Sequence, residues 1–319
     1  MYSEKAKKHA DACRFCFMCR HLCPIERVTG KENNSPRAKG LQVSMMVRGM
    51  EMDKASAVTM YECLLCGACT ADCVTGFDPL VFIREARTLA ALENLTPAFA
   101  QKVIDRLTET GNPYGARESL VNFDGIAEEG DILVWLGNAA RFAVPDVANA
   151  LFAILKKAGA EFAALKNEPP SGCELGDMIG HVEDVRISAK SAAETVTKTG
   201  AKKVIVLDSH DAAFFLHECK DWGIDLPEIV TATSFVENLI VEGRIVPRQV
   251  NEVVSYHDAA RLARDMGETE PARNIIAAMG ADLHELYLNE KDNKNPENKA
   301  CGSFVRAREC GSSLMGQMK

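Results

Sequence analysis

Eight of the twelve cysteines in this 319-residue chain stand in two runs that share one spacing. Each run reads C-x2-C-x2-C-x3-C, the first as CRFCFMCRHLC and the second as CLLCGACTADC. The runs consist of Cys13, Cys16, Cys19 and Cys23, and of Cys63, Cys66, Cys69 and Cys73. Thiolates at this spacing are ligands of 4Fe-4S cubanes, so the two runs predict two such clusters.

The last cysteine of each run is predicted to serve the other cluster, as in the spacing of bacterial ferredoxins. Three thiolates two residues apart can fold round one corner of a cube, whereas the fourth, three residues further on, points away. The predicted ligands are Cys13, Cys16, Cys19 and Cys73 for the first cluster, and Cys63, Cys66, Cys69 and Cys23 for the second. Zinc is the alternative, although it needs four ligands and usually pairs two C-x2-C knuckles. A disulfide framework would require an exported chain.

One position departs from the spacing motif. Pro24 follows the first run, but Val74 stands where the second run should have proline. We expect Pro24 to keep the first turn rigid. We expect the second cluster to be looser or more solvated, with an altered potential.

Length and composition indicate a globular protein of two domains, which we place at residues 1–125 and 126–319. The N-terminus has no apolar h-region, which predicts that there is no cleaved signal peptide. No run of about 18 apolar residues occurs, so we expect no transmembrane segment. Cysteines needed as thiolates indicate a reducing, cytoplasmic setting.

The net charge of −8 is unevenly distributed. Residues 1–50 contain ten Lys or Arg and four acidic residues. Nucleic acid is one partner for a basic segment, but compensation of negatively charged clusters, or docking of an acidic redox partner, fits better. The predicted docking cations are Arg14, Arg20, Arg37 and Lys39.

The remainder of the first domain is predicted to be helical. Residues 41–60 have helical spacing, and their methionines are expected to line the core beneath the clusters rather than form an adaptable binding face. Asp78 and Pro79 predict the N-cap and first residue of a helix whose Arg84, Glu85 and Arg87 form a solvated face. A second helix is expected over 97–110, before Gly111.

Beyond residue 125 short apolar runs alternate with helical segments. Strands are expected within residues 131–137, 160–165, 202–209, 228–233, 252–258 and 282–288. Helices are expected at about 145–158, 181–199, 211–221, 234–242 and 271–279. This order predicts an α/β domain with a mostly parallel sheet, built from two similar halves, after a mainly α-helical two-cluster domain.

Together these features resemble a known family. Two cubane motifs, SPRAKG after the first, IREAR after the second and a duplicated α/β domain are similar to the iron–sulfur subunits of glycolate oxidase, lactate-utilisation and anaerobic glycerol-3-phosphate dehydrogenase complexes. Heterodisulfide reductase subunits share this plan. The resemblance implies a helical ferredoxin domain followed by a cysteine-rich domain with two Cys-Cys-Gly motifs, which can hold a further cluster or act in thiol chemistry.

The chain departs from that pattern at most cysteine positions of the second domain. Asn138 stands at the first such position, Ser171, Gly172 and Cys173 replace the first Cys-Cys-Gly, and Ala300, Cys301 and Gly302 keep part of the second. Ser209–Ala213 and Tyr256–Ala260 also lack the expected cysteines. Two cysteines cannot ligate a cluster alone, so we interpret the domain as a former cofactor site retained as a scaffold or docking surface.

Four residues of this domain keep a metal or redox role open. His210 and His257, at predicted strand ends, could bind zinc or one iron together with Cys173 and Cys301. The favoured interpretation is that His257 and Asp258 cap a helix and that His210 is a surface loop residue.

No phosphate loop, dinucleotide fingerprint or nucleophile triad occurs in the sequence, so no catalytic residue is assigned. The resemblance implies an electron-transfer subunit rather than an enzyme by itself. It would accept electrons from a flavoprotein dehydrogenase acting on a 2-hydroxy acid or similar metabolite and pass them to a quinone or another carrier. Peripheral membrane association would come through that complex. The alternative is a thiol-disulfide or heterodisulfide reductase with its chemistry in the C-terminal domain.

Overall fold

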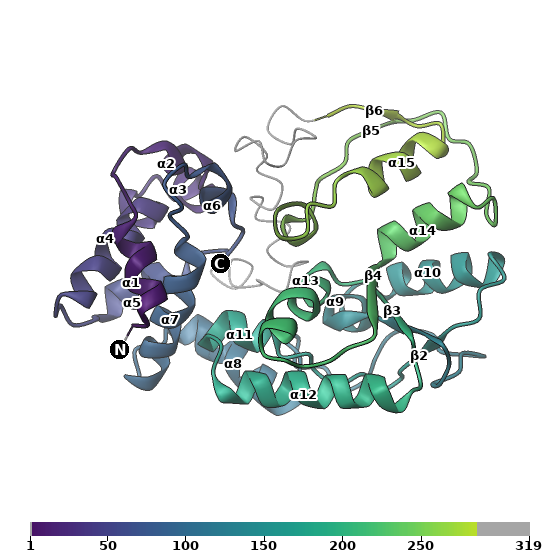
Figure 1. Ribbon diagram of the computed structural model, residues 1–319, viewed down its shortest axis with the longest axis horizontal. Coiled ribbons are helices and arrows are strands. Elements are labelled where there is room, and N and C mark those ends of the chain that lie inside the picture. The colour runs from purple at the N-terminus through teal and green to yellow at the C-terminus, as the bar shows by residue number, and fades with distance from the viewer. Residues whose placement is uncertain (1, 286–319) are drawn as a thin grey trace.

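The computed structural model describes residues 2–285, in which a helical N-terminal part lies beside an α/β C-terminal part (Figure 1). The N-terminal elements are α1 (Glu4–Asp11), α2 (Met18–Leu22), α3 (Pro24–Thr29), η1 (Glu32–Asn34), α4 (Pro36–Val47), α5 (Lys54–Tyr61), α6 (Ala68–Asp72), α7 (Pro79–Leu92) and α8 (Ala98–Thr110). The predicted domain boundary at residue 125 falls in the segment between α8 and the first strand.

The elements around the two cysteine runs repeat at an interval of 50 residues. α1 ends before Cys13 and α2 begins after Cys16. In the same way, α5 ends before Cys63 and α6 begins after Cys66. The N-caps repeat as well. The Ser3 side chain accepts a hydrogen bond from the Ala6 N–H, and the Asp53 side chain accepts one from the Ser56 N–H. The repeated cysteine spacing is therefore part of a larger structural repeat.

The helix expected over residues 41–60 is two helices. α4 ends at Val47 and α5 starts at Lys54, because Gly49 takes a left-handed φ of 105° and Asp53 caps the new helix. Met46 and Met60 are buried in the core as expected, whereas Met45 is exposed. The apolar residues keep a helical spacing across the break between α4 and α5, so only the turn residues Gly49 and Asp53 indicate the break.

α7 begins as predicted, with Asp78 accepting a hydrogen bond from the Leu80 N–H and Pro79 in the first turn. The prediction of a solvated face on α7 is wrong for Arg84 and Arg87. Arg87 is 1% exposed, and Arg84 forms an ion pair with Asp177 of the C-terminal part at 3.2 Å. The C-terminal part covers this side of α7, which the isolated helix pattern could not show.

The C-terminal part is built on a parallel sheet of four strands in the order β2-β1-β3-β4, followed by a separate parallel pair of β5 and β6. The strands are β1 (Ile132–Trp135), β2 (Ala163–Ala164), β3 (Lys203–Val206), β4 (Glu228–Thr231), β5 (Val253–Val254) and β6 (Asp282–Leu283). The helices are α9 (Gly137–Phe142), α10 (Pro145–Lys157), α11 (Cys173–Ile179), α12 (Glu183–Lys198), α13 (Ser209–Phe214), η2 (Phe215–Cys219), α14 (Ala232–Val241), η3 (Arg261–Asp265) and α15 (Glu270–Ala278).

Alternate residues of the central strands face opposite helical layers. Leu133 and Val204 pack in a core shared with α12, whereas Val134 and Ile205 pack in a core shared with α10 and α14. Figure 1 shows α12 on one side of the sheet and α10 and α14 on the other. This three-layer arrangement confirms the predicted α/β class with a parallel sheet.

α7 and α11 form the main contact between the two parts. Besides the Arg84–Asp177 pair, Arg87 Nη1 donates to the Asp177 carbonyl at 2.5 Å, and Thr88 Oγ1 donates to the Ile179 carbonyl at 2.7 Å. Gly180, at the end of α11, has a φ of 79° and lies against α7. None of the helices in residues 2–285 is long and apolar enough to cross a membrane.

Gly180→Ala should loosen this contact. An added Cβ would lie 2.8 Å from the Arg84 carbonyl oxygen, and alanine would have to adopt φ 79° with ψ −179°, a conformation essentially restricted to glycine, at a cost of roughly 1–3 kcal/mol. Gly200→Ala is the control for a positive φ without a close contact, because Gly200 has a φ of 75° and no atom within 4 Å of its Cβ position. We expect a lower denaturation midpoint for both variants, and faster proteolysis between the parts only for Gly180→Ala. Equal proteolysis rates for the Gly180→Ala and Gly200→Ala variants would contradict a close contact between Gly180 and α7.

Candidate iron–sulfur sites

The fold distributes the eight cysteines of the two runs over two cavities. The first site is lined by Cys13, Cys16, Cys19 and Cys73. The second site is lined by Cys23, Cys63, Cys66 and Cys69. Each site thus receives three cysteines from one run and the last cysteine of the other. In residues 2–285, no three His, Cys, Asp or Glu side chains converge closely enough to hold a single metal ion.

Two loops of the same shape present the first three thiols of each run. Phe15 and Leu65 have φ values of 55° and 52°, and Phe17 and Gly67 have values of 69° and 72°. These left-handed residues curl each loop around its cavity. The N–H of Phe15 lies 3.4 Å from Cys13 Sγ, and that of Leu65 lies 3.4 Å from Cys63 Sγ. Backbone donors pointing at sulfur favour thiolates and stabilise the charge of a cluster.

The two sites differ in their exposure to solvent. At the first site Cys16 is exposed, and the neighbouring Phe17, Met18 and Val74 are 50%, 53% and 97% exposed. The second site is enclosed by apolar residues of several elements, namely Pro24, Ile25, Leu64, Pro79, Leu80 and Ile83. The first site therefore lies at the surface and the second lies inside.

Burial makes the cysteines unfavourable as bare thiolates. It raises the pKa of Cys19 to about 12 and that of Cys66 to about 11, and it raises the pKa of Cys69 well above its ordinary value. Four thiolates in such a place require a cationic group to bind them. The donor set, the cavities and the sulfur-directed N–H groups fit 4Fe-4S clusters.

The structure corrects the expected effect of Val74. Cys73 lines the first site, and Val74 lies beside it, almost fully exposed. The missing proline therefore adjoins the first site and not the second, which contains Cys23 and Pro24. The loosening predicted for the second cluster does not follow from this substitution.

The four predicted docking cations also lie in different surroundings. Arg20 pairs with Glu26 and Glu32, each at 3.0 Å. Lys39 is 2% exposed, lines the second site and donates from Nζ to the Asn34 carbonyl at 2.5 Å, so it is not a docking residue. Arg37 lies 4.1 Å from the centre of the Phe17 ring. Arg14 is exposed at the mouth of the first site, where its Nη1 donates to the Asp11 carbonyl at 2.9 Å.

In the C-terminal part, a buried polar network occupies the region of the missing cysteines. The Asn138 side chain bonds to Glu174, while Ser171 donates to Asp211 at 2.5 Å. Burial raises the pKa of Asp211 to about 7, and it raises that of Glu174 well above the usual range. These groups satisfy one another with hydrogen bonds where thiolates were expected.

His210 is not the surface loop residue that we expected. It is 5% exposed, and its Nε2 lies 3.4 Å from Asp177 Oδ2. The buried Asp258 pairs with Arg273 at 2.7 Å. His257, the residue before Asp258, is half-buried. Cys173 is buried, whereas Cys301 lies outside the described residues.

Asp177 is the centre of an ion-pair network that the sequence interpretation missed. Burial raises its pKa, but Arg261, His210 and Arg84 outweigh this effect and hold the pKa well below the usual range. Arg87 was also missed, although it follows Leu80 and Ile83 at helical spacing and thus lies on the predicted core face. That spacing was a signal that Arg87 is buried.

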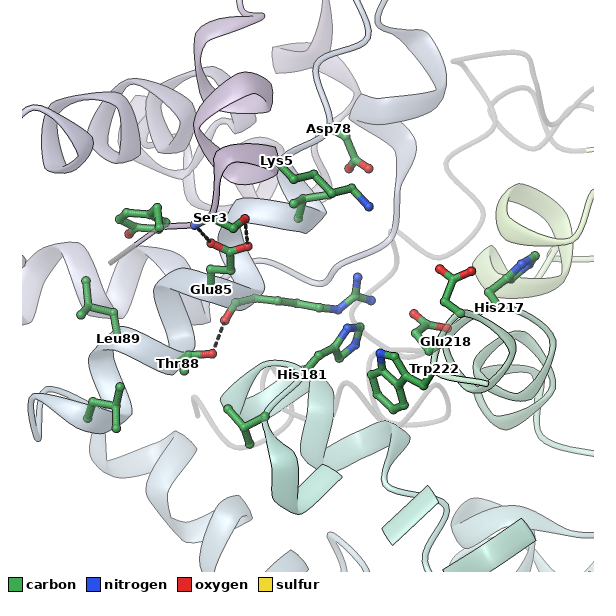
Figure 2. Close-up of a pocket in the computed structure, with 16 residues that line it drawn as sticks. Ser3, Lys5, Asp78, Glu85, Thr88, Leu89, His181, His217, Glu218 and Trp222 are labelled. Atoms are coloured by element: carbon green, nitrogen blue, oxygen red, sulfur yellow. Dashed lines mark hydrogen bonds between the residues drawn. The ribbon is translucent and has the colours of Figure 1, made fainter. Parts of the chain in front are cut away.

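A further cavity of about 670 Å³ lies between the two parts (Figure 2). Glu85 on one wall accepts hydrogen bonds from Ser3, and His181 and Trp222 form part of the other wall. Burial lowers the pKa of His181 to about 4, so the ring is neutral at pH 7. None of the described lining residues is a cysteine.

Comparison with known proteins agrees with these sites. Residues 9–77 match the family model of the 4Fe-4S dicluster domain. One subunit of the dihydromethanophenazine:CoB--CoM heterodisulfide reductase from Methanosarcina acetivorans is 28% identical, over 92% of this chain and 78% of that protein. No solved structure matches the chain.

Two other relatives are longer than this chain. A probable membrane-anchored ferredoxin from Chromohalobacter salexigens is 28% identical over 72% of this chain but only 37% of its own length. The EtfAB:quinone oxidoreductase of Syntrophomonas wolfei is 24% identical over 86% of this chain and 46% of its own length. The chain therefore carries a 4Fe-4S dicluster domain and resembles the iron–sulfur subunit family to which its motifs point.

Proposed function

We propose that this chain is an electron-transfer subunit with two 4Fe-4S clusters, one at each site. The observation that supports this proposal is the division of eight cysteines into two sets of four, in which Cys23 and Cys73 are exchanged between the runs. A bound cubane accepts and donates one electron at a time. The chain supplies the thiols, the N–H groups directed at sulfur, and the difference in exposure between the sites.

The first site is the place for exchange with another protein. Its thiol Cys16 is exposed, and Phe15, Phe17 and Met18 around it form an apolar surface next to the cation Arg14. Apolar contact brings a partner close, while charge orients it. The enclosed second site is shielded from solvent and suits transfer within the complex.

The names of two relatives support a redox protein as the partner. One is named as part of a heterodisulfide reductase and another as an EtfAB:quinone oxidoreductase. We propose that a flavoprotein dehydrogenase acting on a 2-hydroxy acid or similar metabolite exchanges electrons with this chain, and that a quinone or another carrier is the second partner. Any association with a membrane then comes through the complex.

The alternative thiol chemistry lacks a reactive group in the described residues. Cys173 is 3% exposed, and burial raises its pKa well above the ordinary thiol value. A reactive cysteine has a lowered pKa and is accessible. Cys173 has the opposite properties.

Isolation of the chain from its host without oxygen tests the proposal. We expect about eight irons per chain and a copurifying flavoprotein, with two electrons taken up on reduction. About four irons would contradict the pair of clusters. Iron beyond eight would place a further metal site in the C-terminal part.

Paired substitutions test which cysteines share a cluster. Cys13→Ala with Cys73→Ala removes two ligands of the first site, so we expect one cubane to remain, measured as iron and by EPR after reduction. Cys13→Ala with Cys23→Ala removes one ligand from each site, so we expect both cubanes to be damaged. If the first pair of substitutions damaged both cubanes and the second pair left one intact, each run would hold its own cluster.

Arg14→Glu should slow electron exchange with the copurifying flavoprotein several-fold at low salt, because it reverses a charge beside the exposed site. Iron content and reduction by dithionite should not change. Lys102→Glu, an exposed cation on α8, is the control with the same change in charge. Equal rates for Arg14→Glu, Lys102→Glu and the wild type would remove Arg14 from the docking surface.

A further inference from the structure

Three cations from three different elements surround the second site. Lys39 comes from α4, Arg87 from α7 and Arg264 from η3 of the C-terminal part. Burial raises the pKa of Cys23 and that of Cys66, and the charges of Lys39 and Arg264, respectively, oppose this effect. Burial lowers the pKa of Arg87, and the charge of Cys63 opposes that effect.

Arg264 reaches across from the C-terminal part to the second cysteine loop. Its Nη1 donates to the Cys66 carbonyl at 2.9 Å. Its Cδ lies 3.8 Å from the Cβ position of Gly67, which places the arginine side chain in van der Waals range of the loop. Ala260, just before η3, is buried against Cys66. The loop that holds Cys66 is therefore covered by η3.

Arg87 binds the other end of the same loop. Its Nη2 donates to the Cys63 carbonyl at 2.6 Å and to the Met60 carbonyl at 3.1 Å. Its Nη1 donates to the Asp177 carbonyl on α11. Arg261 of η3 also binds Asp177, at 3.3 Å. One network thus fixes both η3 and Arg87 relative to the second site.

The acidic groups of this network are already neutralised. Asp265 Oδ1 lies 3.9 Å from the Cβ position of Gly67, but the carboxylate pairs with Arg261 at 2.7 Å. Asp177 is shared by Arg84, Arg261 and His210. Lys39 is the only charged residue among the described residues that line the second cavity. Lys39 therefore faces the second cavity, while Asp177 and Asp265 are paired with other side chains.

The first site has no comparable set of cations among the described residues. Arg37 acts on Cys19 through a hydrogen bond from its backbone N–H and not through its charge. The Arg37 guanidinium pairs with Glu32 at 2.9 Å. Arg14 lies in solvent and donates to backbone carbonyls. Water screens charge at this exposed site.

We infer that the C-terminal part, which lacks most cysteines of its former cofactor site, sets the reduction potential of the second site by placing Arg264 against the Cys66 loop. One added electron makes a four-thiolate site more negative by one charge. Arg264 is half-buried against the loop, so water screens its charge less than that of a fully exposed cation, and such a cation stabilises the reduced state. Arg264 is thus a potential-setting residue, and the α/β part acts as an electrostatic cap.

This inference rests on the proposed function, since it requires a cluster at the second site. Arg264→Gln removes the charge, and Arg264→Lys keeps it. Lys202→Gln is the control for charge, because Lys202 belongs to the same part and is 77% exposed beside Asp131, away from the carboxyl ends of the strands. The measurement is an anaerobic redox titration of the full chain followed by EPR, with iron counted in each sample. The signal that changes in Cys66→Ser identifies the second cluster.

We expect the potential of the second cluster to become more negative in Arg264→Gln and to stay near the wild-type value in Arg264→Lys and Lys202→Gln. The first cluster and the iron content should not change. An unchanged potential in Arg264→Gln would overturn the inference while leaving the relay function intact. Equal shifts in the Gln and Lys variants, or loss of the second cluster, would show that Arg264 holds the loop rather than sets the potential. A wild-type chain without two reducible clusters would instead refute the proposed function.

Discussion

The exchange of Cys23 and Cys73 between the two cysteine runs is the constraint on which the rest of the structure depends. Because cysteines from both runs line each cavity, segments about 50 residues apart must come together to form either cavity. The repeated helices α1, α2, α5 and α6 bring them together in matching pairs. α7 starts soon after the last cysteine and packs beneath both halves, so the N-terminal part forms one unit around two sites.

Burial and charge then divide the work between the sites. An exposed site exchanges electrons with a partner easily, but water screens the charges around it. Burial raises the pKa of Cys66 and Cys69 at the second site, as it does that of Cys19 at the first. Cations supplied by α4, α7 and η3 oppose that effect at the second site only, within the described part of the chain. The contact between the two parts is therefore also an electrostatic contact.

The parts of the fold that depend on local rules could be predicted from the sequence. Asp78 and Pro79 favour the start of a helix through local geometry, and the cysteine spacing predicted the two sets of four that line the two cavities. Contacts between distant segments could not be predicted in this way. Arg84 and Lys39 were interpreted as solvated because charged side chains usually are, but α11 covers the first and the cysteine loops cover the second.

Polar residues of the C-terminal part fill positions where the family resemblance led us to expect cysteines. Ser171, Asn138 and Asp211 bond with one another or with neighbouring acids, so the buried space does not need metal to satisfy its polar groups. Glu174 of these pairs lies on α11, as does Asp177. Asp177 in turn binds Arg84 of α7 and Arg261 of η3. Its carbonyl accepts a hydrogen bond from Arg87, which also donates to the Cys63 carbonyl, so α11 is connected to the second cysteine loop through Arg87.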